Sequence, residues 1–135
     1  MIVLNKEYDF ELTNEDKILS WISQSITEEG FTEGDINYIF CTDEYLLSLN
    51  IKHLNHNTLT DVISFDYSMG KLISGDVFIS IERVIDNAKS FKVSFENELK
   101  RVMIHGILHY CGYKDKTKEE KIEMINKENF YLSQF

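Results

Sequence analysis

The sequence predicts an α+β fold in which a small mixed β-sheet packs against several helices, in the order βαβαββααα. Short runs of β-forming residues are separated by longer runs whose apolar residues recur every three or four positions, as they do on one face of a helix. The chain contains no proline, and no repeat or linker divides it. Its 135 residues, of which 43% are hydrophobic, can bury a real core. We therefore expect a single domain that spans residues 1–135.

The first half of the chain predicts two strands that alternate with two helices. The expected elements are a strand at 2–5, a helix at 13–30, a strand at 36–41 and a helix at 43–50. Thr13 is the candidate N-cap of the first helix, and Gly30 is the residue that ends it. The second strand is rich in Ile, Tyr and Phe, which favour extended structure.

The second half predicts a β-hairpin followed by three helices. The expected elements are strands at 61–67 and 75–81 and helices at 82–90, 94–111 and 117–132. The turn-like segment SMGKL lies between the two strands, so they can pair as a hairpin. Thr117 followed by Glu120 is typical of a capping box, which marks the start of the last helix.

The formal charge of −9 argues against a broad nucleic-acid surface, because phosphate contacts are made mainly by Lys and Arg. An acidic chain can still confine positive potential to one cleft that holds a metal ion. If this chain binds RNA, we expect a basic rim around such a cleft. The candidates are Lys52, Arg83, Lys89, Arg101, Lys114 and Lys116.

No apolar run approaches the roughly 20 residues that span a bilayer. The N-terminal segment MIVLNKEYDF contains charges too early for a signal peptide. We therefore expect a cytoplasmic protein without a membrane partner. Cys41 and Cys111 are too few for a disulfide framework and are expected to be buried thiols.

A candidate metal site lies in the segment IHGILHYCGYKDK, residues 104–116. His105 and His109 are four residues apart, so their rings stack on one face of a helix and can reach one ion. Gly112 suits the left-handed residue that ends a helix, and the chain can then fold back to bring Asp115 to the histidines. Three ligands with open positions are typical of a catalytic metal. The alternative is a pair of exposed or capping histidines near a helix end.

Two charged residues on the same helix are candidate auxiliaries of this site. Arg101 precedes His105 by four residues and could bind a phosphate, whereas Glu98 could orient a ligand histidine. The alternative is a surface ion pair between Arg101 and Glu98, which are three residues apart.

The segment HGILHYCGYKD resembles the HGxLHxxGYxH element of the YbeY family of ribosomal-RNA maturation factors. LNIKHLNHNTLTDVISFD at 49–66 is similar to the family's LN…TDVLSF segment, and SGDVFISIERV at 74–84 is similar to its GDI.IS strand. The segments have the family's order and spacing, so the resemblance covers nearly the whole chain. It implies that Asp61 lies near the metal site as a further candidate auxiliary, although Asp61 could equally close a turn.

The sequence departs from this family at two positions that matter for chemistry. Asp115 stands where the family has a third histidine; a carboxylate also binds zinc, so the ligand set is kept with one less positive charge. Leu54 stands where the family has an arginine, and a phosphate-binding role cannot pass from arginine to leucine.

Metzincin proteases carry HExxHxxGxxH, in which the glutamate is the general base. This chain shares the spacing of both histidines, the glycine and the third ligand, which favours a zincin-like fold, but it has Gly106 in place of that glutamate. Peptide hydrolysis is therefore not expected. Phosphodiester cleavage depends less on a protein base, because a metal can lower the pKa of water.

The resemblance implies a single-strand-specific metallo-endoribonuclease in the maturation of the 16S rRNA 3′ end and in ribosome quality control. Its expected partners are ribosomal RNA and the small ribosomal subunit, and its expected cofactor is one Zn²⁺ ion, with Fe²⁺ or Ni²⁺ as alternatives. Two other hypotheses stay open. One is a ribosome assembly factor that is stabilised by metal and has little nuclease activity. The other is a metal-dependent hydrolase of a small phosphoester.

Overall fold

The computed structural model describes the backbone of residues 1–54 and 60–135 and the side chains of residues 1–52 and 60–135. Its elements follow the predicted order βαβαββααα. The described part of the chain is an α+β fold with four strands and five helices, so the predicted fold class is confirmed. None of its helices is long and apolar enough to cross a membrane.

The four strands form one mixed sheet in the order β1-β2-β4-β3. The strands are β1 Ile2–Lys6, β2 Thr32–Cys41, β3 Val62–Asp66 and β4 Leu72–Ser80. β1 and β4 each pair with β2 in parallel, whereas β3 pairs with β4 antiparallel and forms the predicted hairpin. This hairpin places β3 at an edge of the sheet, next to the candidate site.

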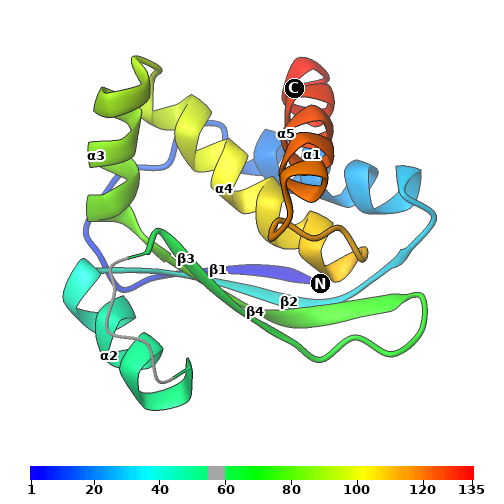
Figure 1. Ribbon diagram of the computed structural model, residues 1–135, viewed down its shortest axis with the longest axis horizontal. Coiled ribbons are helices and arrows are strands. Elements are labelled where there is room, and N and C mark those ends of the chain that lie inside the picture. The colour runs from blue at the N-terminus through cyan, green and yellow to red at the C-terminus, as the bar shows by residue number, and fades with distance from the viewer. Residues whose placement is uncertain (55–59) are drawn as a thin grey trace.

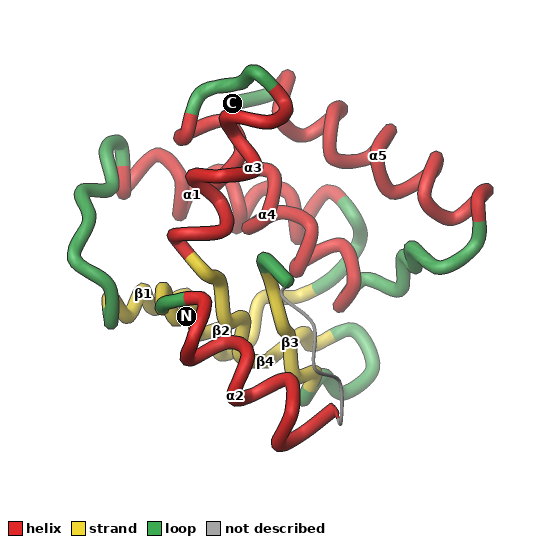
Figure 2. Tube along the Cα trace, turned by 60° about the vertical axis from the view of Figure 1, so that its left-hand side comes forward, coloured by secondary structure: helices red, strands yellow, loops and turns green. Residues whose placement is uncertain are grey.

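The helices divide unequally between the two faces of the sheet (Figure 1). The helices are α1 Glu15–Glu28, α2 Asp43–Leu54, α3 Ile81–Phe91, α4 Phe95–Tyr110 and α5 Lys118–Ser133. Figure 2 shows α2 on one side of the sheet and the other four helices on the opposite side. The larger group covers the main core, while α2 packs over a smaller cluster that includes Cys41, Leu46 and Ile63.

Helix α4 lies against the sheet at the centre of the main core. Leu99, Met103 and Ile107 are fully buried along it. Gly106 faces β4 so closely that a Cβ atom there would lie 3.2 Å from a methyl group of Val77. The absence of a side chain at Gly106 therefore lets α4, which carries both histidines, rest directly on the strand.

The local signals at the helix ends differ in reliability. The capping box of Thr117 and Glu120 is present as predicted. Thr13, in contrast, is not the N-cap of α1: the helix begins one residue later, after Asn14, whose φ of 56° is left-handed. Asn adopts the left-handed conformation more readily than most residues with a side chain, a preference that the apolar pattern alone did not reveal.

The two cysteines are both free thiols. Cys41 is buried as predicted, at 2% exposure. Cys111 is only partly buried, because it is the residue that caps the C-terminal end of α4.

Candidate metal centre

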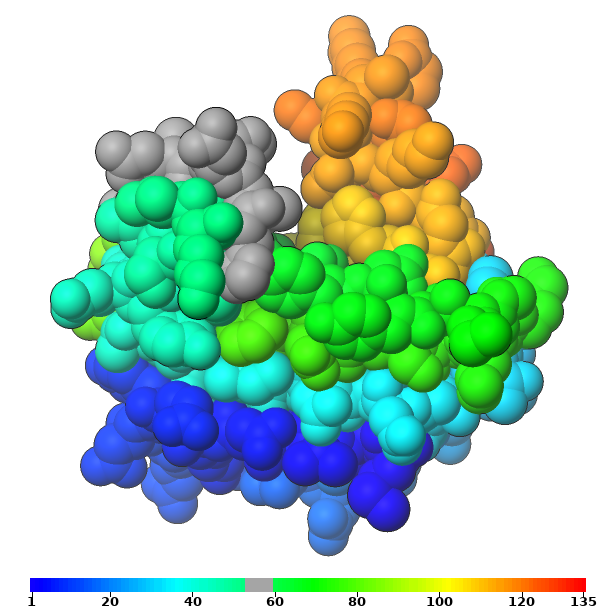
Figure 3. Space-filling view, turned by 90° about the horizontal axis from the view of Figure 1, so that it is seen from below, coloured from blue at the N-terminus to red at the C-terminus, as the bar shows by residue number. Residues whose placement is uncertain are grey.

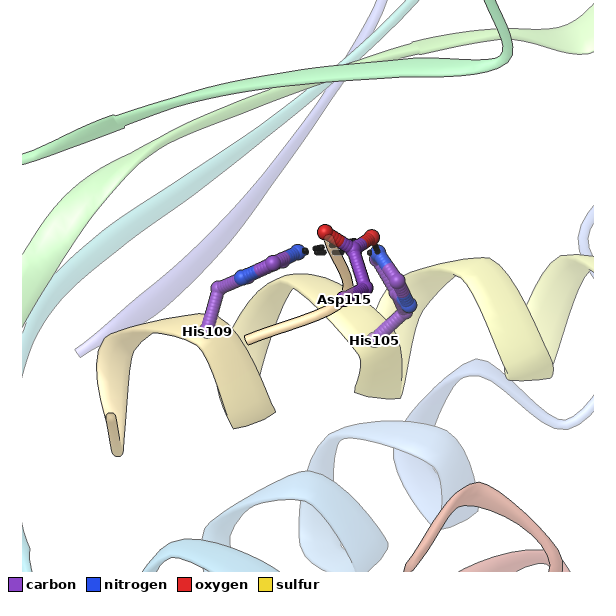
Figure 4. A group of neighbouring side chains, drawn as sticks. All are labelled: His105, His109 and Asp115. Carbon is purple, nitrogen blue, oxygen red and sulfur yellow. Dashed lines mark hydrogen bonds and ion pairs between the residues drawn. The ribbon is translucent and has the colours of Figure 1, made fainter. Parts of the chain in front are cut away.

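Three side chains that could hold a metal ion meet at the C-terminal end of α4. His105 and His109 lie one turn apart on the helix, and Asp115 belongs to the segment that follows it. Figure 4 shows the carboxylate of Asp115 between the two rings, with all three side chains pointing toward the sheet. His109 Nε2 lies 3.0 Å from His105 Nε2, and Asp115 Oδ2 lies 3.3 Å from His105 Nε2 and 3.4 Å from His109 Nε2. The described residues thus contain a His-His-Asp candidate metal site.

The separations among these three atoms fit a tetrahedrally coordinated divalent ion. Histidine nitrogens and carboxylate oxygens bind zinc at about 2.0–2.2 Å, so neighbouring ligand atoms of a regular tetrahedron are about 3.3–3.6 Å apart. The observed separations of 3.0–3.4 Å lie close to that range. Three protein ligands also leave a coordination position open for water or substrate. The donor set therefore suits a catalytic ion better than a structural one.

The end of α4 brings Asp115 back to the histidines. Gly112 has a φ of 101°, which L-residues with side chains rarely adopt. The N–H of Gly112 donates to the carbonyl of His109 at 3.0 Å, and the N–H of Tyr113 donates to the carbonyl of Leu108 at 3.0 Å. These two bonds form a Schellman motif, which reverses the chain direction. The reversal predicted from the sequence is therefore present.

Glu128 on α5 fixes the orientation of the His105 ring. Its Oε2 lies 2.6 Å from His105 Nδ1, and its side chain is only 7% exposed. A hydrogen bond from Nδ1–H to this carboxylate leaves Nε2 free to face Asp115 and His109. Burial by itself lowers the pKa of His105, but the hydrogen bond and charge of Glu128, together with the charges of Asp115 and Asp61, outweigh burial and raise that pKa. Metal-binding histidines usually donate their second ring N–H to a carboxylate, and the contact between His105 and Glu128 has this arrangement.

The candidate site opens into a cavity of about 350 Å³. Helix α4 contributes Glu98, Arg101, His105 and His109 to its lining. The segment that leads into β3 and the strand itself contribute Thr60, Asp61, Val62 and Ser64. In Figure 3 the orange segment that follows α4 rises from the green strand region as a projection of the surface. The three candidate ligands are 19%, 30% and 39% exposed in their side chains, so a substrate can reach them.

A family model described as "Endoribonuclease YbeY" matches residues 3–135 of the chain. The chain belongs to the YbeY family. Relatives named endoribonuclease YbeY from Flavobacterium psychrophilum and Flavobacterium johnsoniae are 58% and 57% identical over 135 residues. These alignments cover 100% of this chain and 96% and 97% of the respective relatives.

A solved structure agrees with this assignment at the level of the fold. The solution structure of TM1509 from Thermotoga maritima superimposes with a TM-score of 0.69 at 26% identity. The superposition covers 98% of this chain and 87% of that protein. The family model and the relatives confirm the resemblance to the YbeY family that the sequence motifs indicated, and the structural match confirms the fold.

The structure places the candidate auxiliaries in the same cavity but with other partners than expected. Arg101 donates from one nitrogen to Glu128 Oε1 at 2.8 Å and from another to Asn129 Oδ1 at 2.7 Å. It makes no ion pair with Glu98, which is buried at 3% exposure. The acceptor for His105 is Glu128, not Glu98. Asp61 lines the cavity, and burial raises the pKa of its carboxyl group against the attraction of His105.

Of the six candidates for a basic rim, Arg101 is the one that lines the cavity. Among the described residues, Arg101 is the one lysine or arginine in the lining, which also contains four carboxylates. Arg83 instead pairs with Asp43 at 2.9 Å. The side chain of Leu54, at the position of the family's arginine, lies outside the described side chains.

Glu128 is the functional residue that the sequence did not reveal. It lies 23 residues after His105, on a helix whose acidic residues look alike in the sequence. Its burial is the distinguishing property: Glu128 is 5% exposed, whereas Glu119 and Glu123 on the same helix are exposed. The spacing of Glu128 from Met124 and Tyr131, both buried, places it on the core face of α5 and is the one signal that could have identified it.

Proposed function

We propose that this member of the YbeY family is a metal-dependent endoribonuclease that hydrolyses phosphodiester bonds of single-stranded RNA. The observation that carries the proposal is the convergence of His105, His109 and Asp115 within 3.0–3.4 Å of one another in an open cavity. A histidine and carboxylate set with an open position is the donor set of hydrolytic metal enzymes. The family membership supports RNA as the substrate.

The donor chemistry fits a divalent ion, and we propose zinc, with Fe²⁺ and Ni²⁺ as the alternatives. A divalent ion held by these three side chains would polarise the phosphodiester and lower the pKa of water. The protein's own contribution is to hold the donors in place. Glu128 accepts from His105 Nδ1, and Arg101 in turn holds the Glu128 carboxylate at 2.8 Å.

Peptide hydrolysis is not part of the proposal. Metzincin proteases place a glutamate directly after the first histidine, and this chain has Gly106 there. A Cβ atom at that position would lie 3.2 Å from Val77, so α4 and β4 would have to separate to admit a glutamate.

The proposed biological role is maturation of the 16S rRNA 3′ end together with ribosome quality control. The proposed partners are ribosomal RNA and the small ribosomal subunit, and the proposed location is the cytoplasm. Residues 1–135 form one domain in this proposal. The support for this role is membership of the YbeY family over residues 3–135.

The proposal is tested by measuring bound metal and RNA cleavage in the same preparation. We expect about one divalent ion per chain, cleavage of single-stranded RNA, and loss of cleavage with a chelator that is reversed by added metal. His109→Ala should lose both metal and cleavage, whereas Glu123→Ala, an exposed change on α5, should lose neither. Cleavage that survives removal of the metal would refute the proposed mechanism.

The acidic lining of the cavity favours one alternative, a metal-stabilised ribosome assembly factor with little nuclease activity. The described lining has four carboxylates against one guanidinium, which Glu128 and Asn129 already engage. Metal retention without RNA cleavage would support the assembly factor. Turnover of a small phosphoester without RNA cleavage would support a hydrolase of small molecules instead.

A further inference from the structure

Glu98 is a buried acid for which the metal site has no evident use. It lies in the first half of α4, is 3% exposed, and lines the cavity that contains the candidate ligands. Its carboxyl group makes no hydrogen bond or ion pair with any side chain that the structure describes. A buried ionised carboxylate without a partner is costly. Because Glu98 faces the cavity, its carboxyl group can be satisfied by water or a ligand there, or by a proton.

The charges around Glu98 favour the proton. Arg101, the cation on the same helix, directs its guanidinium to Glu128 and Asn129. The other charged neighbours are Asp61, which directly precedes β3, and Glu128 on α5, and both are acidic. Burial, followed by repulsion from Asp61, raises the pKa of Glu98 to about 7, and Arg101 offsets only part of this effect.

A neutral carboxyl group at Glu98 would reduce the repulsion between the cavity lining and an anionic substrate. A phosphodiester is an anion, and the described lining of the cavity is dominated by carboxylates. A protonated Glu98 removes one negative charge from that lining and offers an O–H donor. Proteins use acids that stay protonated at neutral pH in this way, as hydrogen-bond donors in apolar surroundings.

We propose that Glu98 is a substrate-binding residue, which as a neutral carboxylic acid donates its O–H to a phosphate oxygen of the bound RNA. Glu98 precedes His105 by seven residues, two turns of the helix, or about 10 Å along its axis. It therefore contacts a phosphate that flanks the one at the metal site. This inference rests on the proposed endoribonuclease function.

The proposal is tested with two variants that separate the donor from the charge. Glu98→Gln keeps the shape and a donor but cannot ionise, and Glu98→Leu removes the donor. Glu96→Gln is the matched control, because it removes one exposed acid from the first turn of the same helix. The measurements are KM and kcat for single-stranded RNA with metal-loaded protein from pH 6 to 9, and the dissociation constant of the same RNA with chelator-treated protein.

We expect the wild type to bind RNA about tenfold more weakly at pH 8.5 than at pH 6, because the loss of one hydrogen bond to a charged group has about this effect. Glu98→Gln should bind like the wild type at pH 6 and keep that affinity at pH 8.5. Glu98→Leu should bind about tenfold more weakly at pH 6, with the change in KM rather than kcat. Glu96→Gln should follow the wild type at every pH.

Two results would overturn the proposal. Glu98→Gln could bind as weakly as Glu98→Leu, which would show that the group acts as a carboxylate; or both variants could keep the wild-type KM and dissociation constant at every pH. Neither variant should lower the unfolding temperature, since each removes a buried ionisable group. If Glu98→Leu fails to fold, the pH profile of Glu98→Gln decides.

A wild type that binds RNA without cleaving it would refute the endoribonuclease function alone, and the role of Glu98 would then be judged by the dissociation constants. Absence of RNA binding would refute both.

Discussion

Glu128 should control how tightly the candidate site binds metal, although it is not a ligand itself. Its Oε2 lies 2.6 Å from His105 Nδ1, and its Oε1 accepts from Arg101 at 2.8 Å. Glu128→Ala removes the acceptor that holds the His105 ring, so the ring can rotate and exchange its tautomers. Loss of such a partner typically weakens metal binding by about 10–100-fold, or about 1.4–2.7 kcal/mol. Glu128→Gln keeps an acceptor oxygen but loses the charge, so we expect a smaller decrease.

The pH dependence gives this prediction a second readout. Glu128 helps to raise the pKa of His105, despite the opposing effect of burial. A proton therefore competes with the metal at low pH, and wild-type affinity should fall as pH decreases through that pKa. Without the charge of Glu128 the pKa of His105 is lower, so the variant suffers less competition. The difference in metal affinity between wild type and variant should thus be largest near pH 8 and narrow toward pH 6.

The assay is a zinc titration in competition with a chromophoric chelator at each pH. Glu123→Ala is the matched control, because it removes an exposed glutamate from the same helix. Thermal unfolding in the presence of chelator measures any loss of stability that does not involve metal. Equal zinc affinity for the wild type and Glu128→Ala, in protein that remains folded, would refute the role assigned to this carboxylate.

Three other changes test separate parts of the structure. Asp115→His replaces a charged ligand with a neutral one, so the pKa of water at the site should fall and the pH–rate profile should move toward acid; an unmoved profile with unchanged metal content would show that residue 115 is not a ligand. Gly106→Ala places a Cβ atom 3.2 Å from a Val77 methyl group. Overpacking costs about 1–3 kcal/mol and the better helix propensity of Ala offsets about 1 kcal/mol, so the free energy of unfolding should fall by about 1–2 kcal/mol in urea titrations; a rise of about 1 kcal/mol would contradict the close packing of α4 on β4. Burial raises the pKa of Glu29, but hydrogen bonds from Tyr131 and two other side chains outweigh this effect and lower it, so Glu29→Gln should cost about 1–3 kcal/mol at pH 7. The stability that Glu29 contributes is fully present above the pKa of Glu in the unfolded chain and is lost as pH falls through the lower pKa of the folded protein. The difference in unfolding free energy between wild type and Glu29→Gln should therefore shrink below about pH 4.5, and a difference that stays constant with pH would refute this role of Glu29.

The sequence by itself determined the order of the elements and the local geometry of the candidate ligands. Periodicity of apolar residues identified nine elements in the correct order, because the pattern follows directly from which face of a helix or strand is buried. The spacing of His105, His109, Gly112 and Asp115 also acts locally, since one helical turn and one left-handed residue bring the three donors together. Strand and helix boundaries were less well defined: β2 begins at Thr32, four residues before the predicted start.

The tertiary structure alone decided what surrounds those ligands. Contacts between residues far apart in the chain depend on how α4, α5 and the sheet pack, and no short-range pattern encodes them. Packing gave His105 its partner on α5, 23 residues away, and turned Arg101 from a candidate phosphate binder into the partner of that same carboxylate. It also buried Glu98, which the helical spacing had placed beside a solvent-exposed arginine. The physical reason is that burial and neighbouring charges set the protonation state and the contacts of each acidic side chain. Both are properties of the assembled core and not of the local sequence.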